Sequence, residues 1–416
     1  MAESVVVTGM GTINPLGDNL ADTWQNAVSG VSGIDRISLF DASEFQVQIA
    51  GEVKGFSPEA ILGSKEARRR DRCEQLSAVA AQEALNQANL SSSQVDPQRA
   101  GVIVSSAIGG ITSLQDTILT AFSDNPRRVS PFAIPMLMSN GPAGMIAIDH
   151  GFLGPCFSVA SACASGIDAI GVAWTLLRSG ALDVVIAGAS EATITRTGVA
   201  AFDRLGAMSR RNELPPQTPQ PFDLNRDGLV MGEGAAILVL ERESHARQRG
   251  ASILGEIVGY AATADAYHVT APQENGLGGA RAMKLALASA GITPHDLGYI
   301  NAHGTATSLN DLAETRAIKS ALGEFAYQIP ISSTKSMTGH MMGATGALET
   351  IFCVQACRHQ VVPPTIHYST PDPECDLDYV PNVSRPAHIA YAMNNAFGFG
   401  GHNAVVVVKS VHINQI

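Results

Sequence analysis

The chain reads VASACASGIDAIGVAWTLLR over residues 159–178, and this stretch decides the expected fold. It predicts a short apolar strand, a turn of small residues around Cys163 and Gly166, and then a helix. The apolar residues of the predicted helix recur at spacings of three and four, at Ile167, Ile170, Trp174 and Leu177. A strand that enters a helix through a tight turn is the repeating unit of an α/β protein.

The same order occurs again in the second half of the chain. Residues 331–358 predict a strand, a turn through Ser332-Ser333-Thr334-Lys335, and a helix. A helix, a polar turn and a strand at 81–103 match 280–300 in the same way, and the terminal strand 404–408 resembles 235–240. We therefore expect two related α/β halves in one compact unit, covering residues 1–250 and 251–416.

Glycine punctuates the predicted strands. The run Val5-Val6-Val7 is followed by Gly9 and Gly11, which predicts a turn after the first strand, and the run 183–186 is expected to end at Gly188. Residues 203–227 are polar and contain four prolines, so we expect a long surface excursion there.

Composition excludes several classes of protein. Of the 416 residues, 45% are hydrophobic and 16% are charged, which is the opposite of a disordered chain. The net charge of −11 argues against a general nucleic-acid binder. Apolar runs stay below the ~18 residues of a membrane helix, and Glu3 stands where a secretory signal needs basic residues. We expect a cytoplasmic protein without membrane association.

The six cysteines do not predict a disulfide framework in a chain of this length. Cys353 and Cys357 are four residues apart in an apolar segment, which favours core packing over metal binding. Cys163 differs, because a thiol at a helix N-terminus meets the positive end of the helix dipole, which favours the thiolate. On this segment alone a catalytic nucleophile and a buried structural cysteine remain equally open.

Three further segments carry side chains or backbone groups suited to catalysis. In Asn301-Ala-His303-Gly-Thr305-Ala-Thr307 the histidine follows a predicted strand, where α/β sites lie, although a turn histidine is the alternative. In Ser333-Thr-Lys335-Ser-Met-Thr-Gly-His340 a lysine and a histidine flank another strand-to-helix turn, and Glu349 is a possible partner for the lysine. The run Phe397-Gly-Phe399-Gly-Gly401 predicts a mobile gate or an oxyanion hole. A phosphate-binding loop is its rival, but the Gly-Lys-Ser/Thr ending is missing.

Together these segments resemble the β-ketoacyl-[acyl carrier protein] synthases, and most closely the synthase II type. The resemblance spans nearly the whole chain and includes Arg226-Asp227-Gly228, Met231 to Gly234 and Asp265 to Pro272. It implies the thiolase fold, a five-layered α/β/α/β/α sandwich of duplicated halves. It also implies a homodimer, with a heterodimer with a related subunit as the alternative.

The resemblance further implies a role for each candidate residue. Cys163 would accept the acyl group, while His303 and His340 would assist decarboxylation of the malonyl unit. Lys335 would order the site by pairing with Glu349. Phe399 would gate the nucleophile, and its backbone N–H with that of Cys163 would form the oxyanion hole. The remaining implied contacts are to the phosphopantetheine arm (Thr305, Thr307) and to an acidic acyl carrier protein (Lys65, Arg68, Arg69, Arg127, Arg128).

The implied reaction is decarboxylative condensation in fatty acid synthesis, with no metal or redox cofactor. A type II polyketide or polyene ketosynthase using the same Cys-His-His chemistry is the alternative. Departures from the family at Cys73, Ala133, Ala396 and residues 141–143 leave chain length and substrate open. A thiolase is disfavoured because the C-terminal glycine loop has no cysteine, and a synthase III type would carry Asn at His340. A non-catalytic chain-length subunit would lack Cys163.

Overall fold

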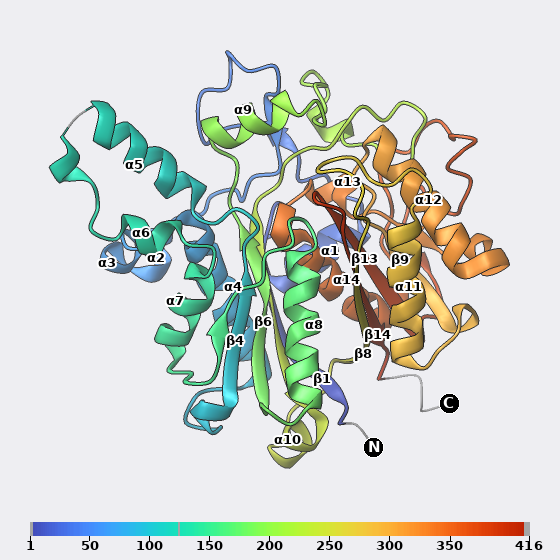
Figure 1. Ribbon diagram of the computed structural model, residues 1–416, viewed down its shortest axis with the longest axis horizontal. Helices are drawn as coiled ribbons and strands as arrows, with labels where there is room; N and C mark the ends of the chain where they lie inside the picture. The colour runs from blue at the N-terminus through green and yellow to red at the C-terminus, as the bar shows by residue number, and fades with distance from the viewer. Residues whose placement is uncertain (1–2, 124, 412–416) are drawn as a thin grey trace.

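The computed structural model describes residues 3–123 and 125–411 and is built around one mixed sheet. Its ten strands lie in the order β10-β9-β13-β14-β8-β1-β7-β6-β4-β5 (Figure 1). The strands of the first half are β1 (Val5–Ile13), β4 (Ala100–Ser105), β5 (Cys156–Phe157), β6 (Val184–Glu191) and β7 (Gly234–Arg242). Those of the second half are β8 (Gly255–Ala264), β9 (Leu297–Asn301), β10 (Ile331–Ser332), β13 (Tyr391–Gly398) and β14 (His402–Lys409). Two short ribbons, β2 (Asp35–Arg36) with β3 (Ile49–Ala50) and β11 (Val361–Val362) with β12 (Arg385–Pro386), lie apart from it.

The predicted internal repeat is present in the topology. In the first half β1 and β7 pair antiparallel, as do β7 and β6, whereas β6, β4 and β5 run parallel. In the second half β8, β14, β13, β9 and β10 repeat this pattern strand for strand. The halves join where β1 pairs with β8. This pair is antiparallel, so one continuous sheet runs through both halves.

Six long helices complete the layers (Figure 1). Helices α8 (Ser165–Arg178) and α14 (Thr345–His359) contact each other and share the largest hydrophobic core with residues of both halves of the sheet. Helices α4 (Arg72–Ala88) and α7 (Gly141–His150) cover the other face of the first half, and α11 (Leu277–Ala290) and α12 (Ser308–Leu322) cover that of the second. This is the α/β/α/β/α sandwich expected from the resemblance.

The remaining helices surround this body. They are α1 (Leu20–Val28), α2 (Pro58–Leu62), α3 (Ser64–Ala67), α5 (Ile111–Ser123), α6 (Ala133–Leu137), α9 (Arg196–Arg204), α10 (Glu243–Gln248) and α13 (Lys335–Thr338). Six 3₁₀ turns accompany them: η1 (Pro97–Arg99), η2 (Pro126–Arg128), η3 (Pro215–Gln217), η4 (Pro294–Asp296), η5 (Gly323–Tyr327) and η6 (Met342–Ala344). Helix α5 projects from the side of the molecule, and α9 lies across its upper end (Figure 1). In the part of the chain described, no helix combines the length and the apolar character needed to cross a membrane.

The predicted glycine turn after the first strand is wrong. Strand β1 continues through Gly9 and Gly11 because α4 packs directly on its backbone. A Cβ on Gly9 would lie 2.1 Å from the Ala84 carbonyl oxygen, and a Cβ on Gly11 would lie 2.1 Å from that of Ala80. These glycines permit a close helix–strand contact rather than a reversal of the chain.

Other boundaries also differ from the expected ones. Strand β6 does not end at Gly188 but continues to Glu191, and the strand before Cys163 is only the residue pair Cys156–Phe157. The expected surface excursion at 203–227 turns inward in its second part, where Phe222 is fully buried and stacks on Tyr379 at 4.0 Å between ring centroids.

The helix that follows Cys163 agrees with its predicted periodicity. Its four expected apolar positions, Ile167, Ile170, Trp174 and Leu177, are all buried. Cys353 and Cys357 lie on α14 in the central core, so they pack as the sequence predicts.

Candidate active site

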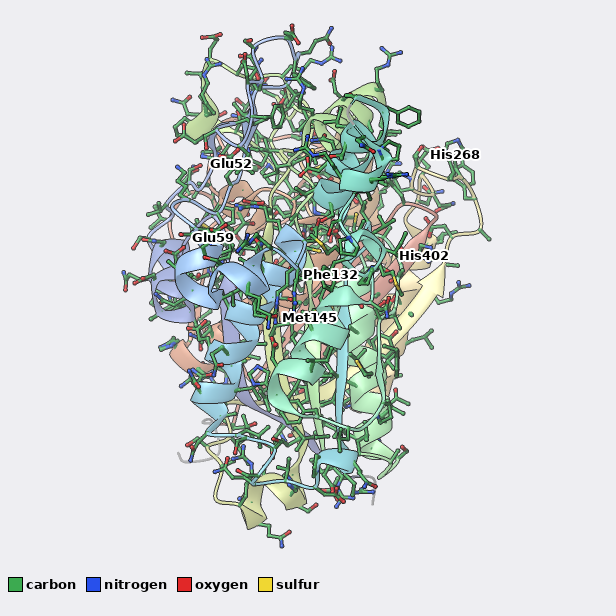
Figure 2. The ribbon with its side chains drawn as sticks, turned by 90° about the vertical axis from the view of Figure 1, so that its left-hand side faces the viewer. Glu52, Glu59, Phe132, Met145, His268 and His402 are labelled. Carbon is green, nitrogen blue, oxygen red and sulfur yellow. The ribbon has the colours of Figure 1, made fainter. Side chains whose placement is uncertain are left out.

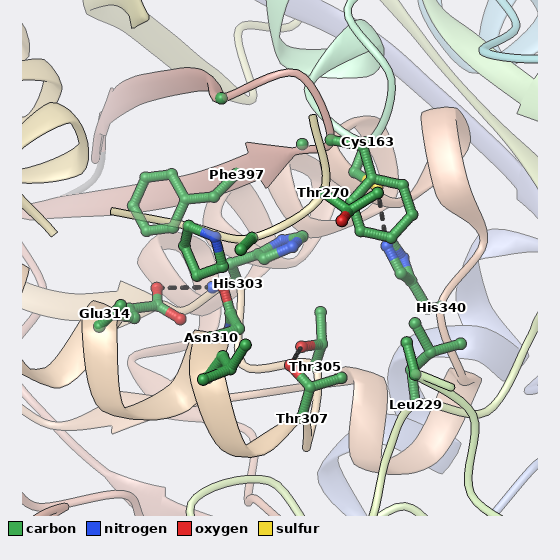
Figure 3. Close-up of a pocket in the computed structure, with 18 of the residues that line it drawn as sticks. Cys163, Leu229, Thr270, His303, Thr305, Thr307, Asn310, Glu314, His340 and Phe397 are labelled. Atoms are coloured by element: carbon green, nitrogen blue, oxygen red, sulfur yellow. Dashed lines mark hydrogen bonds between the residues drawn. The ribbon is translucent and has the colours of Figure 1, made fainter. Parts of the chain in front are cut away.

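The candidate residues from both halves meet at one pocket of about 310 Å³ (Figure 3). Cys163 stands just before α8, His303 follows β9, and His340 follows α13. These three and Phe399, which follows β13, all line the pocket. Cys163 thus lies beside residues that are about 140 to 240 positions further along the chain.

The nucleophile turn holds Cys163 in a constrained position. Ala162 has a left-handed φ of +51°, and the Ala164 and Ser165 amides donate to the carbonyl oxygens of Ser161 and Ala162. Cys163 is only 9% exposed. Burial raises the pKa of Cys163 to about 12, although Lys335 and the backbone N–H of Phe399 act to lower it. Burial therefore acts against the thiolate that the helix N-terminus is expected to favour.

The two histidines lie beside the sulfur. His340 Nε2 is 3.0 Å from Cys163 Sγ, and His340 Nδ1 is 3.0 Å from Thr345 Oγ1. The rings of His303 and His340 are edge to face, with centroids 5.4 Å apart. Burial, reinforced by the charge of Lys335, lowers the pKa of both imidazoles well below the usual value. Both rings are neutral at physiological pH and can donate one N–H each.

Lys335 and Glu349 form the pair that the resemblance implies. The Nζ–Oε1 distance is 2.7 Å, and each side chain is 1% exposed. Burial raises the pKa of Glu349 to about 7, while the lysine charge acts to lower it. The lysine supplies the local positive charge that acts to lower the pKa values of Cys163, His303 and His340.

Sequence reasoning missed Glu314, which orients the histidine loop. Its carboxylate accepts the backbone N–H groups of His303 at 2.8 Å and Gly304 at 2.7 Å (Figure 3). Burial raises the pKa of Glu314 to about 7. The sequence does carry a pattern that points to Glu314. Asp311 and Glu314 are spaced i, i+3, and they share the buried face of α12 with the apolar residues Ala317 and Ile318.

The glycine-rich segment lies directly against the nucleophile. A Cβ on Gly398 would be 2.9 Å from the Cys163 nitrogen, so only glycine permits this approach. Gly400 and Gly401 have φ of +86° and +73°, and the Gly400 N–H donates to the Val269 carbonyl oxygen. The backbone N–H groups of Phe399 and Cys163 both act to lower the pKa of the thiol. This pair of donors has the arrangement of an oxyanion hole.

The remaining candidates fall into two places. Thr305 and Thr307 line the pocket, with their hydroxyl oxygens 2.9 Å apart. The five predicted docking residues lie outside it on the surface, on or next to α3 (Lys65, Arg68, Arg69) and on η2 (Arg127, Arg128).

The arginines of residues 68–72 divide between the surface and buried ion pairs. The Arg69 guanidinium lies 4.9 Å from the ring centroid of Phe132, a residue of the segment that follows η2, so the two basic clusters are neighbours. Arg70 and Arg72 are instead committed to ion pairs with Asp149 and Glu233.

The site combines a thiol nucleophile, two neutral imidazole donors and two backbone N–H donors. Such a set can form a thioester and stabilise negative charge on oxygen at two positions. Apolar residues on the pocket wall, among them Phe202, Leu205 and Leu229, leave room for an extended thioester arm.

Comparisons with known proteins agree with this chemistry. The family described as "Beta-ketoacyl synthase, N-terminal domain" matches residues 2–246, and the corresponding C-terminal domain matches 254–369. A 3-oxoacyl-[acyl-carrier-protein] synthase 2 of Staphylococcus aureus (strain COL) is 47% identical over 97% of this chain and 98% of its own. One of Synechocystis is 47% identical over 97% of both chains.

Two solved structures have the same fold. One is a type II PKS acyl-carrier protein in complex with its ketosynthase bound to the hexaketide, where the matched chain has a TM-score of 0.91 and 36% identity. It covers 99% of this chain and 100% of the other. The second is a β-ketoacyl synthase from Burkholderia phymatum STM815, with a TM-score of 0.91, 33% identity and the same coverage.

Proposed function

The chain belongs to the β-ketoacyl synthase family, and from this premise we propose how its residues divide the reaction. It is an acyltransferase of the 3-oxoacyl-[acyl-carrier-protein] synthase type, which extends acyl chains in fatty acid synthesis. The observation that carries the assignment of roles is the 3.0 Å contact between Cys163 Sγ and His340 Nε2, with His303 beside it and two backbone N–H groups on the sulfur.

In the first half-reaction Cys163 receives the acyl group. Sγ bonds to the thioester carbon, the bond from that carbon to the pantetheine sulfur breaks, and the thiol proton ends on the departing sulfur. The carbonyl oxygen becomes negative in the tetrahedral intermediate, where the N–H groups of Cys163 and Phe399 donate to it. Because the pKa of Cys163 is raised to about 12, its thiol is protonated until substrate arrives.

In the second half-reaction malonyl-carrier loses carbon dioxide. The electron pair of the broken carbon–carboxylate bond forms an enolate, and its oxygen accepts N–H hydrogen bonds from neutral His303 and His340. The enolate carbon attacks the Cys163 thioester, and the collapse of the tetrahedral intermediate expels the thiolate and leaves β-ketoacyl-carrier. Every step uses groups of this chain, so we propose that no resident metal or redox cofactor takes part.

The Thr345 hydroxyl fits the donor role of His340. When this hydroxyl donates to Nδ1, the ring proton resides on Nε2 and points toward Sγ. We assign Phe399 to the gate because it stands between Gly398 and two left-handed glycines and lines the pocket beside the nucleophile. Thr305 and Thr307 are assigned to the phosphopantetheine arm because their hydroxyls face the same space.

The basic clusters on α3 and η2 are assigned to docking of the carrier. Acyl carrier proteins are acidic, whereas this chain carries a net charge of −11, so approach requires a local positive surface. At physiological salt the screening length is about 8 Å, which lets a local patch dominate at close range. The solved ketosynthase with 36% identity is in complex with an acyl-carrier protein, which supports a carrier-borne substrate here.

We propose a homodimer that assembles through the β5 edge of the sheet. Strand β5 pairs only with β4 in the described chain, so its outer backbone edge is open. Figure 2 views this side of the molecule, with Phe132 and Met145 near its centre. Exposed apolar side chains gather on the elements around the edge, at Ile118, Leu119, Phe122, Ile134, Met138, Ile148 and Leu153. A second copy would cover them.

The cytoplasmic location remains a prediction from the sequence.

Mass spectrometry of acyl groups trapped on Cys163 tests the proposed substrate. We expect saturated acyl-carriers to load Cys163 and to be extended after malonyl-carrier is added. Selective loading by polyketide or polyene carriers would favour the alternative pathway, to which the structural similarity with a type II PKS ketosynthase also points. The 47% identity to two 3-oxoacyl-[acyl-carrier-protein] synthases favours the fatty acid pathway.

A further inference from the structure

Glu191, the last residue of β6, is fully buried and has no part in the reaction described above. Its carboxylate lies between two loops. Oε1 accepts the Ser106 hydroxyl at 2.7 Å and the Ile108 N–H at 3.3 Å, and Oε2 accepts the N–H groups of Ala107 at 2.8 Å and Gly343 at 3.1 Å. One side chain thus joins the loop that follows β4 to the η6 turn.

The two loops are packed so closely that no side chain fits between them at Gly343. A Cβ on Gly343 would lie 2.8 Å from both the Ala107 nitrogen and Glu191 Oε2. The Ser106 hydroxyl also accepts the Gly109 N–H at 2.8 Å, so its own proton is available for Glu191. All four partners of the carboxylate are therefore donors, and a neutral amide in its place would set an NH₂ group against them.

The η6 turn is the C-terminal support of His340. Before the turn, the His340 backbone is fixed by its N–H donating to Val230 and by Gly232 donating to its carbonyl. Three residues later, the Gly343 N–H is fixed by Glu191. Between these anchors the ring spans Cys163 Sγ and Thr345 Oγ1, at 3.0 Å from each.

The carboxylate also acts electrostatically on the nucleophile. Its negative charge is among the causes that raise the pKa of Cys163, and Lys335 acts in the opposite direction. Glu191 likewise acts to raise the pKa of Cys73 on α4. Burial raises the pKa of Glu191 itself to about 7, while its four hydrogen-bond donors act to lower it.

We propose that Glu191 is a positioning residue of the condensation: its carboxylate fastens the turn after His340 to the loop after β4 and so fixes the His340 ring against Cys163 and the malonyl enolate. This inference rests on the proposed function of the same site. It assigns a catalytic consequence to a carboxylate that does not line the pocket.

A double-mutant cycle of Glu191→Gln with His340→Ala tests the proposal. We expect Glu191→Gln to slow malonyl decarboxylation by about 10-fold or more, a part of the loss of a whole oxyanion donor, while acylation of Cys163 and KM for malonyl-carrier are retained. In the His340→Ala background the same substitution should cost nothing further, because the residue acts through that ring. An equal loss in both backgrounds would overturn the proposal.

Glu83→Gln is the matched control. Glu83 accepts the backbone N–H groups of Thr12 and Leu20, and burial raises its pKa as well, but it lies on α4 away from the pocket. We expect it to lower Tm without changing decarboxylation.

If Glu191→Gln does not fold, Ser106→Ala replaces it in the same double-mutant cycle, because it removes one of the four donors. We expect this variant to slow decarboxylation by about 3-fold, and we expect no further loss in the His340→Ala background.

A second test needs no carrier substrate: the rate at which iodoacetamide alkylates Cys163 is measured as a function of pH. Removal of the Glu191 charge should lower the pH midpoint of alkylation, whereas Glu83→Gln should leave it unchanged. The same midpoint in wild type and Glu191→Gln would contradict the electrostatic effect of Glu191 on the nucleophile. An inactive wild type would refute the proposed function instead, and the alkylation arm would still report on Glu191.

Discussion

In the proposed mechanism, Cys163 is the residue on which both half-reactions depend. It is the one cysteine that lies in a strand-to-helix turn and lines the pocket; of the other five, four are buried away from that pocket and Cys156 is exposed on β5. Burial raises its pKa to about 12, while the backbone N–H groups of Phe399 and Cys163 act to lower it.

Substitution Cys163→Ala should abolish condensation. The acyl group then has no acceptor, whereas malonyl decarboxylation should persist because the two histidine donors remain. Product analysis by mass spectrometry and release of carbon dioxide measure the two outcomes separately. Continued elongation by the alanine variant would assign the nucleophile elsewhere.

His303→Ala and His340→Ala should each slow decarboxylation by about 10²-fold or more, the effect of one lost oxyanion donor. Acylation of Cys163 should continue in both variants, because the oxyanion hole for that step is formed by backbone N–H groups. Single-turnover loading of radiolabelled acyl-carrier measures it. A folded variant that fails to load would instead make that histidine the base for the thiol.

At the scale of elements, the N-terminal ends of α8 and α14 set the spacing of the site. A Cβ on Gly166 would lie 2.7 Å from the Ala347 nitrogen, and one on Gly346 would lie 2.8 Å from Ile167 Cγ1. The two helices therefore approach through glycine on both sides. This contact places the turn of Cys163 next to the helix that follows the His340 loop.

The junction of β1, β7 and α10 predicts an acid dependence of stability. Buried Glu241 accepts hydrogen bonds from Thr8, His245 and Arg249. Burial opposes its charge, but these partners prevail and lower the pKa of Glu241 from 4.5 to about 2. Its contribution to the free energy of unfolding is thus complete above the unfolded value of 4.5 and is lost as pH falls toward 2.

Urea unfolding of Glu241→Gln against wild type at several pH values measures this effect. We expect the variant to be less stable by about 3 kcal/mol near neutral pH, at 1.36 kcal/mol per pKa unit, and the difference to shrink below pH about 4.5. A difference that is constant down to pH about 3 would show that folding does not lower the pKa of this carboxyl.

At the scale of the whole molecule, carrier docking should depend on the basic clusters. Arg68→Glu with Arg127→Glu should raise KM for acyl-carrier and flatten its dependence on salt, since charges at the rim of an interface set the association rate. Turnover of a small acyl-pantetheine should barely change. The exposed pair Arg247→Glu with Lys284→Glu, on α10 and α11, makes the same change in net charge elsewhere and should leave KM unaltered. Equal losses with both substrates would indicate structural damage.

Assembly through the β5 edge predicts a change of oligomeric state. Ile148→Glu with Leu153→Glu places two charges beside this edge, where the native side chains are 75% and 67% exposed in the single chain. Light scattering should report a dimer for wild type and a monomer for the variant. Val383→Glu, at a position 72% exposed in the C-terminal half, should remain dimeric. A wild-type monomer would refute the proposed interface.

The sequence by itself determined the duplicated α/β architecture and the chemical groups of the site. The strand-to-helix segments around Cys163 and Lys335 and the glycine run around Phe399 carry their signal locally, in residue type and spacing. Their meeting in one pocket is an observation of the tertiary structure.

Only the tertiary structure decided the protonation of those groups and the hydrogen bonds that hold them in place. The pKa of Cys163 depends on burial by both halves, and the continuation of β1 through Gly9 depends on the close approach of α4. Glu191 and Glu314 support the two histidine loops only through contacts made in the folded chain. Glu191 accepts a hydrogen bond from a segment more than 80 residues away, and Glu314 accepts one from a segment about ten residues away. Desolvation and hydrogen bonding are set by neighbours in space, which spacing along the chain does not specify.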